Sequence, residues 1–280
     1  MIALIAMAGL LDALRQADAR VAAVAWRLQT ANVAICRDIV PLAGLSIETL
    51  EQYAPAERAE ARSGLGFGDL PQISTVVPGS AAARAGVQVG DELVAVDDVP
   101  VPPAQGGPSS YERTAGIEAS LAAALAKPPA RLTLARRVVS LTGDPGCASA
   151  VQLVPGRRFD ASADGHYVQI SGPMYEFTTS DDELAFLIAH ELAHNVVPAA
   201  RRAKDGGAQR LAELAADRSA IQMMARAGYN VTIVVPFLER LGRKRRLSWL
   251  DGTHPSWNAR VAAATAEAAV WRTPGAKPAQ

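Results

Sequence analysis

One short stretch of the sequence combines two histidines and a glutamate in a spacing that suits metal chemistry. Residues 190–194 read HELAH. Side chains four residues apart lie on one face of a helix, so His190 and His194 can present both imidazoles to one metal ion. Glu191 would then lie beside the metal, where a general base for an activated water belongs. The competing interpretation is a pair of surface histidines on an ordinary helix.

The residues around this motif predict the helix that it requires. Ser180 followed by Glu183 matches a capping box, and the two residues between them are aspartates, which suit the positive end of a helix. Pro198 marks the end of the helix. We therefore expect a helix over residues 181–197.

A catalytic zinc ion needs a third protein ligand, and the next helical stretch offers one. Glu213 follows His194 by 19 residues, within the sequence ELAAD. Asp217, one turn later on the same face, can accept a hydrogen bond from a ligand histidine and fix its tautomer. Taken alone, Glu213 would be interpreted as a solvated helix residue, but after HELAH the ligand interpretation is favoured. Two histidines and one glutamate leave one coordination position for water, which is the catalytic arrangement.

Four motifs in a fixed order make this part of the chain similar to a known family. HELAH, ELAAD, AGYN at 227–230 and THPS at 253–256 together resemble the HtpX-like zinc metallopeptidases of the gluzincin group. The resemblance covers about residues 148–272. It implies one zinc ion per chain and endopeptidase activity on unfolded or membrane-associated proteins.

The same resemblance implies roles for further residues. His254 would donate to the oxyanion of the tetrahedral intermediate or act as a reversible fourth zinc ligand, and the alternative is a surface or capping histidine. Arg260 would orient an acidic neighbour or the substrate backbone. The strand near residues 167–171 would align the substrate as an added β-strand.

Residues 64–142 differ in character from the rest of the chain. Short β-branched runs alternate with Gly, Pro and Asp, which is typical of strands and turns, and an Ala/Leu-rich stretch at 114–126 predicts one helix. GLGF, followed by PGSAAARAG and GDELVAVDD, resembles a PDZ domain of the bacterial protease-associated kind. The resemblance implies that the backbone N–H groups of Leu65, Gly66 and Phe67 hold the C-terminal carboxylate of a peptide. The alternative is a module that only braces its neighbour.

The two cysteines bracket this PDZ-like segment. A disulfide between Cys36 and Cys147 would tie the ends of an insertion, and two unrelated buried thiols are the alternative. We expect an α+β protein, with a mostly helical peptidase domain that has a small edge-strand sheet, and a β-barrel-like PDZ domain. The expected boundaries are 1–36 for an N-terminal peptidase helix, 37–143 for the PDZ domain with its core at about 62–140, 144–272 for the peptidase domain and 273–280 for a disordered tail.

Composition narrows the classes of function. The 280 residues include 28 basic and 28 acidic side chains, and this zero formal charge argues against a nucleic-acid-binding surface. No apolar run reaches the roughly 18–20 residues of a membrane helix, so we expect no transmembrane span, while association with a membrane stays open. Residues 1–14 are either a trimmed export signal or the first turns of a buried helix.

These features together predict a zinc endopeptidase that cleaves unfolded or misassembled exported proteins. Its partners would be protein or peptide substrates, with the PDZ domain recognising substrate C-termini. The alternative function is a PDZ scaffold or chaperone-like adaptor with a latent peptidase domain. The expected location is the bacterial periplasm. A cytoplasmic enzyme with free thiols is the alternative, because the export signal is poor.

Overall fold

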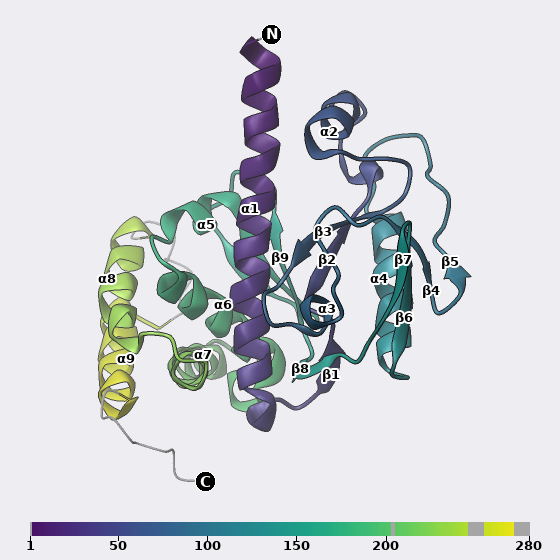
Figure 1. Cartoon of the computed structure of the whole chain (residues 1–280). Coiled ribbons are helices and arrows are strands. Elements are labelled where there is room, and N and C mark those ends of the chain that lie inside the picture. The colour runs from purple at the N-terminus through teal and green to yellow at the C-terminus, as the bar shows by residue number, and fades with distance from the viewer. Residues whose placement is uncertain (1, 203–204, 246–254, 272–280) are drawn as a thin grey trace. The chain divides into compact units, whose positions relative to one another are not determined.

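The computed structural model describes residues 2–202, 205–245 and 255–271 (Figure 1). The chain divides into two units. Unit 1 comprises Met1–Trp26 and Val40–Pro145, and unit 2 comprises Arg27–Ile39 and Gly146–Gln280. Helix α1 (Ile2–Ala31) contributes residues to both units. Both units combine helices with small sheets, so the predicted α+β class is confirmed.

Unit 1 contains most of the strands. A four-stranded sheet has the order β5-β4-β6-β7, and a further pair joins β2 to β3. A third pair joins β1 to β8, whose outer ends, Ile39 and Gly146 with Cys147, already belong to unit 2. The turn after β4 places Asp97 and Asp98 at φ of 47° and 67°, which suits the tight hairpin to β5. The elements are β1 (Ile39–Leu42), β2 (Leu45–Glu48), η2 (Leu50–Gln52), α2 (Arg58–Leu65), β3 (Gln72–Val76), α3 (Ala81–Arg84), β4 (Leu93–Val96), β5 (Val99–Pro100), α4 (Glu112–Leu125), β6 (Ala130–Leu134), β7 (Arg137–Leu141) and β8 (Asp144–Cys147).

Helix α4 covers the core of unit 1, because its apolar side chains recur on one face. Ile117 and Leu121 of this helix are buried in one cluster with Ile47 of β2, Leu93 of β4 and Leu132 of β6. The sequence predicted this helix over residues 114–126, and it forms with nearly those bounds.

Unit 2 is mostly helical and holds one three-stranded sheet of order β10-β11-β9. Helix α6 lies against β10 and β11 on one side and packs along α7, while α9 packs against α7 and α8. The elements are η1 (Val33–Ile35), β9 (Ala150–Val154), β10 (Ala161–Ala163), β11 (Tyr167–Ser171), α5 (Gly172–Phe177), α6 (Asp181–Val196), η3 (Pro198–Ala200), α7 (Gly206–Arg226), η4 (Val231–Ile233), α8 (Val234–Lys244) and α9 (Trp257–Trp271).

Of the apolar N-terminal residues 1–14, residues 2–14 form the first part of α1, which begins at Ile2. Within the described part of the chain, no helix is both long enough and apolar enough to cross a membrane. The predicted tail 273–280 lies outside the described residues.

Candidate metal centre

Helix α6 carries the HELAH motif. The hydroxyl of Ser180 caps its first turn by accepting a hydrogen bond from the backbone N–H of Glu183 at 3.2 Å, as the capping pattern predicts. His190 and His194 lie one turn apart, are both buried, and have ring centroids 4.9 Å apart. The helix therefore presents two imidazoles to one side.

Helix α7 brings the third predicted ligand to these histidines. The carboxylate oxygens of Glu213 lie 3.5 Å from Nε2 of His190 and 3.7 Å from Nε2 of His194. The ligand atoms of the three residues all lie within 4.8 Å of one another. Ligands at about 2.0–2.2 Å from a tetrahedral ion are about 3.3–3.6 Å apart, so this spacing is that of a metal-binding set.

The polar contacts of the two imidazoles test whether these residues fit a metal ion. Nδ1 of His194 lies 2.5 Å from the carbonyl oxygen of Ala200, which leaves Nε2 as the nitrogen with the lone pair. This Nε2 is buried and has no hydrogen-bond partner among the described residues. Nδ1 of His190 lies 3.0 Å from Oδ1 of Asp217, so its Nε2 also faces Glu213. The residues fit, because a metal ion would give the buried Nε2 of His194 the partner that it lacks, with Nε2 of His190 and Glu213 beside it.

Asp217 is fully buried and is held by Arg260 of α9. Nε of Arg260 donates to Oδ2 at 2.7 Å, and Nη2 donates to Oδ1 at 2.5 Å. Burial alone would raise the pKa of Asp217, but the charge and hydrogen bonds of Arg260 and His190 lower it below the usual range. Asp217 therefore stays ionised next to His190, and Arg260 orients an acidic neighbour, which is one of its two implied roles.

The pKa values of the two histidines are shifted in opposite directions. Burial opposes protonation of His190, but the hydrogen bonds and charges of Asp217 and Glu213 outweigh it and raise the pKa of His190 to about 9. Burial and the neighbouring His190 lower the pKa of His194 to about 4. Because a metal ligand is a deprotonated imidazole nitrogen, a metal ion competes with a proton at His190.

Glu191 is buried beside the three ligands and has a partner that the sequence does not reveal. Nη2 of Arg202 donates to its Oε2 at 3.1 Å. Arg202 lies in the connection between α6 and α7, where no periodic pattern predicts a contact. Gln209 was also missed, although it donates to Oε1 of Glu213 at 2.8 Å. Its position four residues before Glu213 on one helix is a signal that could have identified it.

His254 lies outside the described residues, so its two implied roles stay predictions.

The strand predicted to align substrate is not at an edge of the sheet. β11, at residues 167–171, pairs with β10 on one side and β9 on the other. A strand paired on both sides has no backbone groups left for a substrate, so the prediction for β11 is wrong. Among the described strands β10 is an edge strand, and it lies against α6.

Asn195, directly after the second histidine of the motif, fixes the β10–β11 hairpin. Its Oδ1 accepts a hydrogen bond from the N–H of Gly165 at 2.7 Å, and its Nδ2 donates to the carbonyl of Tyr167 at 3.0 Å. Gly165 has φ of +103°, a backbone conformation that residues other than glycine rarely adopt. The edge strand is thereby anchored beside the metal-binding helix.

The predicted carboxylate loop of the PDZ domain also needs correction. Leu65 is the last residue of α2, Gly66 caps that helix with φ of +71°, and the ring of Phe67 is buried in a cluster with Leu50 and Ala61. A glycine after a helical run is a common C-terminal cap, and GLGF plays that part here.

The strand that lies beside α4 is β2, which precedes the GLGF segment in the chain. Thr49, directly after β2, shares a 3.0 Å hydrogen bond with Thr114 of α4, and Ile47 of β2 packs in the cluster that contains Ile117. The segment that contains Gly44, at φ of +69°, therefore leads into the strand beside α4, whereas Leu65, Gly66 and Phe67 lie at the end of α2.

The predicted disulfide is present. Cys36 and Cys147 are bonded, with Cα atoms 5.5 Å apart and a sequence separation of 111. Both cysteines belong to unit 2, and the chain between them includes all of Val40–Pro145. The bond therefore ties together the two ends of an inserted segment.

Comparison with family models assigns both parts of the chain. A PDZ domain model matches residues 72–113, and a Peptidase family M48 model matches residues 196–268. The chain carries a PDZ domain and an M48 metallopeptidase domain. The M48 match includes Glu213, Asp217 and Arg260, and it begins two residues after the HELAH motif, at Val196. No curated protein and no solved structure matches the chain.

Proposed function

We propose that this M48 metallopeptidase is a zinc-dependent endopeptidase that cleaves unfolded or misassembled exported proteins. The observation that carries the proposal is the convergence of His190, His194 and Glu213, with ligand atoms within 4.8 Å, beside the buried carboxylate of Glu191. Two histidines and one glutamate form the ligand set of a catalytic zinc ion, because one coordination position remains for the reacting groups.

The chain's own residues divide the chemistry between them. His190, His194 and Glu213 would hold the metal, and Asp217 with Arg260 would keep His190 in the tautomer that offers Nε2. When bound, zinc supplies Lewis-acid activation of water and of the scissile carbonyl. The Glu191 carboxylate accepts the proton of the attacking water and passes it to the leaving amine when the peptide bond breaks.

The free edge of β10 supplies a place for an extended substrate. β10 lies against α6, and Asn195 anchors its hairpin next to His194. A peptide that pairs with this edge as an extra strand would pass alongside the metal ligands. Main-chain hydrogen bonds do not depend on the identity of the substrate side chains, which suits an enzyme that acts on unfolded chains of varied sequence.

The PDZ domain would recruit substrates by their C-termini. We place its groove between β2 and α4, where the partly buried Leu45 at the start of β2 offers apolar surface, with the carboxylate held by the segment before β2. In a titration of the full-length Glu191→Gln protein, a peptide with an apolar last residue should bind. Its amidated form should bind about 1–3 kcal/mol more weakly, because the charge is gone. Equal affinities would leave the PDZ domain as a brace.

An exported location follows from the same proposal. The Cys36–Cys147 disulfide supports it, because such bonds persist in oxidising compartments such as the bacterial periplasm. Alkylation and intact-mass analysis of protein taken from its native compartment should show no reactive thiol before reduction. Two alkylated cysteines would favour the cytoplasm.

The deciding experiment for the proposed activity combines metal content with proteolysis. Purified protein should contain one zinc ion per chain and should degrade casein, and a chelator should abolish the activity until zinc is restored. The Glu191→Gln variant is the matched control, since it should retain zinc and lose activity. Zinc-loaded protein without any proteolysis would instead indicate a PDZ scaffold with a latent peptidase domain.

A further inference from the structure

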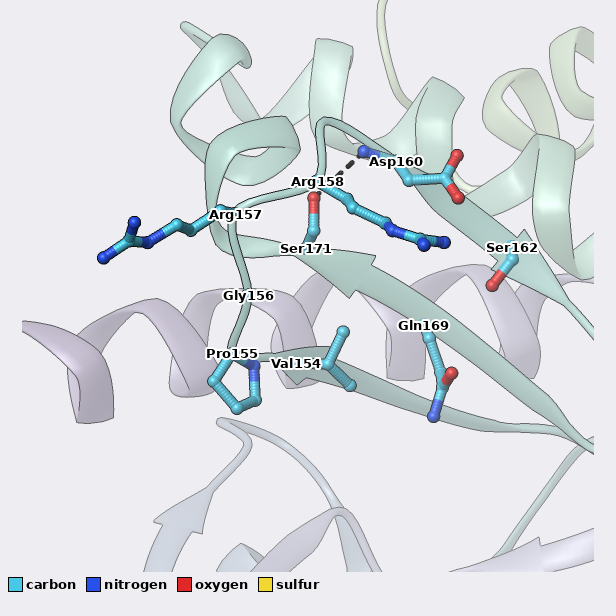
Figure 2. Close-up of a pocket in the computed structure, with 9 residues that line it drawn as sticks. All are labelled: Val154, Pro155, Gly156, Arg157, Arg158, Asp160, Ser162, Gln169 and Ser171. Atoms are coloured by element: carbon cyan, nitrogen blue, oxygen red, sulfur yellow. Dashed lines mark hydrogen bonds between the residues drawn. The ribbon is translucent and has the colours of Figure 1, made fainter.

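A polar pocket of about 390 Å³ opens on the face of the unit 2 sheet that points away from α6 (Figure 2). Val168 and Ile170 of β11 are fully buried, so alternation along the strand turns Gln169 and Ser171 to the opposite face. Ser162 of β10 stands directly opposite Gln169 in the register and shares that face. The loop 155–158 closes one side of the pocket.

The pocket is rich in hydrogen-bond donors that the protein itself does not use. Within the described part of the chain, Arg158, Ser162 and Gln169 have no side-chain hydrogen bond or ion pair to another residue. Ser171 is engaged, because its hydroxyl accepts the N–H of Asp160 at 3.1 Å and caps α5. The carboxylate of Asp160 lies 3.3 Å from the guanidinium of Arg245, so the acidic group of the pocket already has a cation.

The two arginines of the loop differ in direction. Figure 2 shows the side chain of Arg158 extending over the sheet toward Ser162, whereas that of Arg157 points away from the sheet. Only Arg158 can therefore present its guanidinium to a group inside the pocket. A guanidinium with an amide and a hydroxyl nearby offers several donors, which matches the oxygens of a carboxylate.

The position of the pocket connects it with the substrate path. β10 contributes Ser162 to the pocket, and its free edge is the one proposed above to pair with substrate. In an added strand, alternate side chains point to the face that bears the pocket. A side chain at such a position would lie next to Ser162 and within reach of the long Arg158 side chain.

We propose that this pocket is a subsite for an acidic side chain of the peptide substrate, with Arg158 as the residue that binds its carboxylate. The inference rests on the proposed endopeptidase function and adds a preference to it. Substrates with Asp or Glu at one position on the outward face of the added strand are cleaved faster than the same peptides with a neutral residue there.

The test compares peptides that differ only by Glu or Gln, scanned through each position on both sides of the cleaved bond. With zinc-loaded wild-type protein, kcat/KM for Glu over Gln should be about three- to tenfold at one position, as expected for one charge-assisted contact. The Arg158→Ala variant should bring this ratio to about 1, and Arg158→Glu should bring a Lys-containing peptide above the Glu peptide.

Arg157→Ala is the matched control, because it removes the same charge from the same loop but a side chain that points away. It should keep the wild-type ratio. Equal loss of the ratio in Arg157→Ala and Arg158→Ala would overturn the proposal, since it would indicate general attraction by positive charge. A wild-type ratio near 1 at every position would overturn it as well. If no peptide of the series is cleaved, the endopeptidase function itself fails, and this subsite fails with it.

Discussion

The Cys36–Cys147 disulfide should stabilise unit 2 by an amount that depends on whether the inserted segment unfolds together with unit 2. The bond joins cysteines 111 positions apart. If the whole loop is a flexible chain in the unfolded state, the loop-closure relation gives a lost entropy of about 16 cal/mol/K, or about 4.8 kcal/mol at 25 °C. The gain is smaller if unit 1 remains folded while unit 2 unfolds.

In that second case the inserted segment acts as one short link. β1 and β8 pair with each other, so a folded unit 1 already holds its own two ends together. The flexible loop then contains only the roughly eight residues from 36 to 40 and from 145 to 147, for which the same relation gives about 2.5 kcal/mol. We therefore expect a disulfide contribution between about 2.5 and 4.8 kcal/mol.

Urea unfolding followed by circular dichroism measures this contribution. Oxidised wild-type protein should be compared with the same protein under reducing conditions. A double Cys36→Ser/Cys147→Ser variant is the second comparison. Its free energy of unfolding should be lower than that of the reduced wild-type protein, because Cys147 is fully buried and a serine hydroxyl there costs about 1–3 kcal/mol. If reduction changes the free energy of unfolding by less than about 1 kcal/mol, the loop-closure reasoning is refuted for this protein.

Four further changes test the metal centre and its surroundings. Glu191→Gln should keep zinc, measured by mass spectrometry, and should lower casein hydrolysis by several orders of magnitude. His190→Ala should lose zinc in equilibrium dialysis. Arg260→Met should cost about 3–5 kcal/mol in urea unfolding, because Asp217 is left as an unpaired buried charge, and adding Asp217→Asn should recover part of that loss. Burial and a neighbouring carboxylate raise the pKa of Asp18 to about 7 from an ordinary 3.8, so the folded state binds this proton more tightly and stability falls as pH rises from about 4 to 7. Asp18→Asn should therefore raise Tm at pH 8 and leave it unchanged at pH 4.

The parts of the fold that the sequence predicts well depend on local periodicity. α6 begins at Asp181 and ends at Val196, within one residue of the prediction, because its cap, its acidic first turn and Pro198 all act within a few residues. The same spacing rule that places His190 over His194 also places Asp217 one turn beyond Glu213. Inside a rigid helix, such positions in the sequence fix positions in space.

The parts that the sequence predicts poorly depend on contacts between distant segments. Nothing local distinguishes β11, which is central, from β10, which is at the edge, since both are short and flanked by turns. Arg202 reaches Glu191 only because the connection after α6 folds back over the motif. These contacts arise from packing and register, which one sequence does not specify.

The GLGF segment shows why a motif needs its structural context before it predicts a site. The preceding residues, AERAEARS, are mostly helix formers, and a glycine after such a run can end a helix as readily as it can open a binding loop. What distinguishes a carboxylate loop is the strand that follows it, which must lie beside the helix that forms the other wall of the groove. In this protein the strand beside α4 is β2, as the hydrogen bond between Thr49 and Thr114 indicates. HELAH needs no such test within its own helix, because its two histidines are positioned by the helix that contains them. Only the third ligand, Glu213, depends on the packing of α7 against α6.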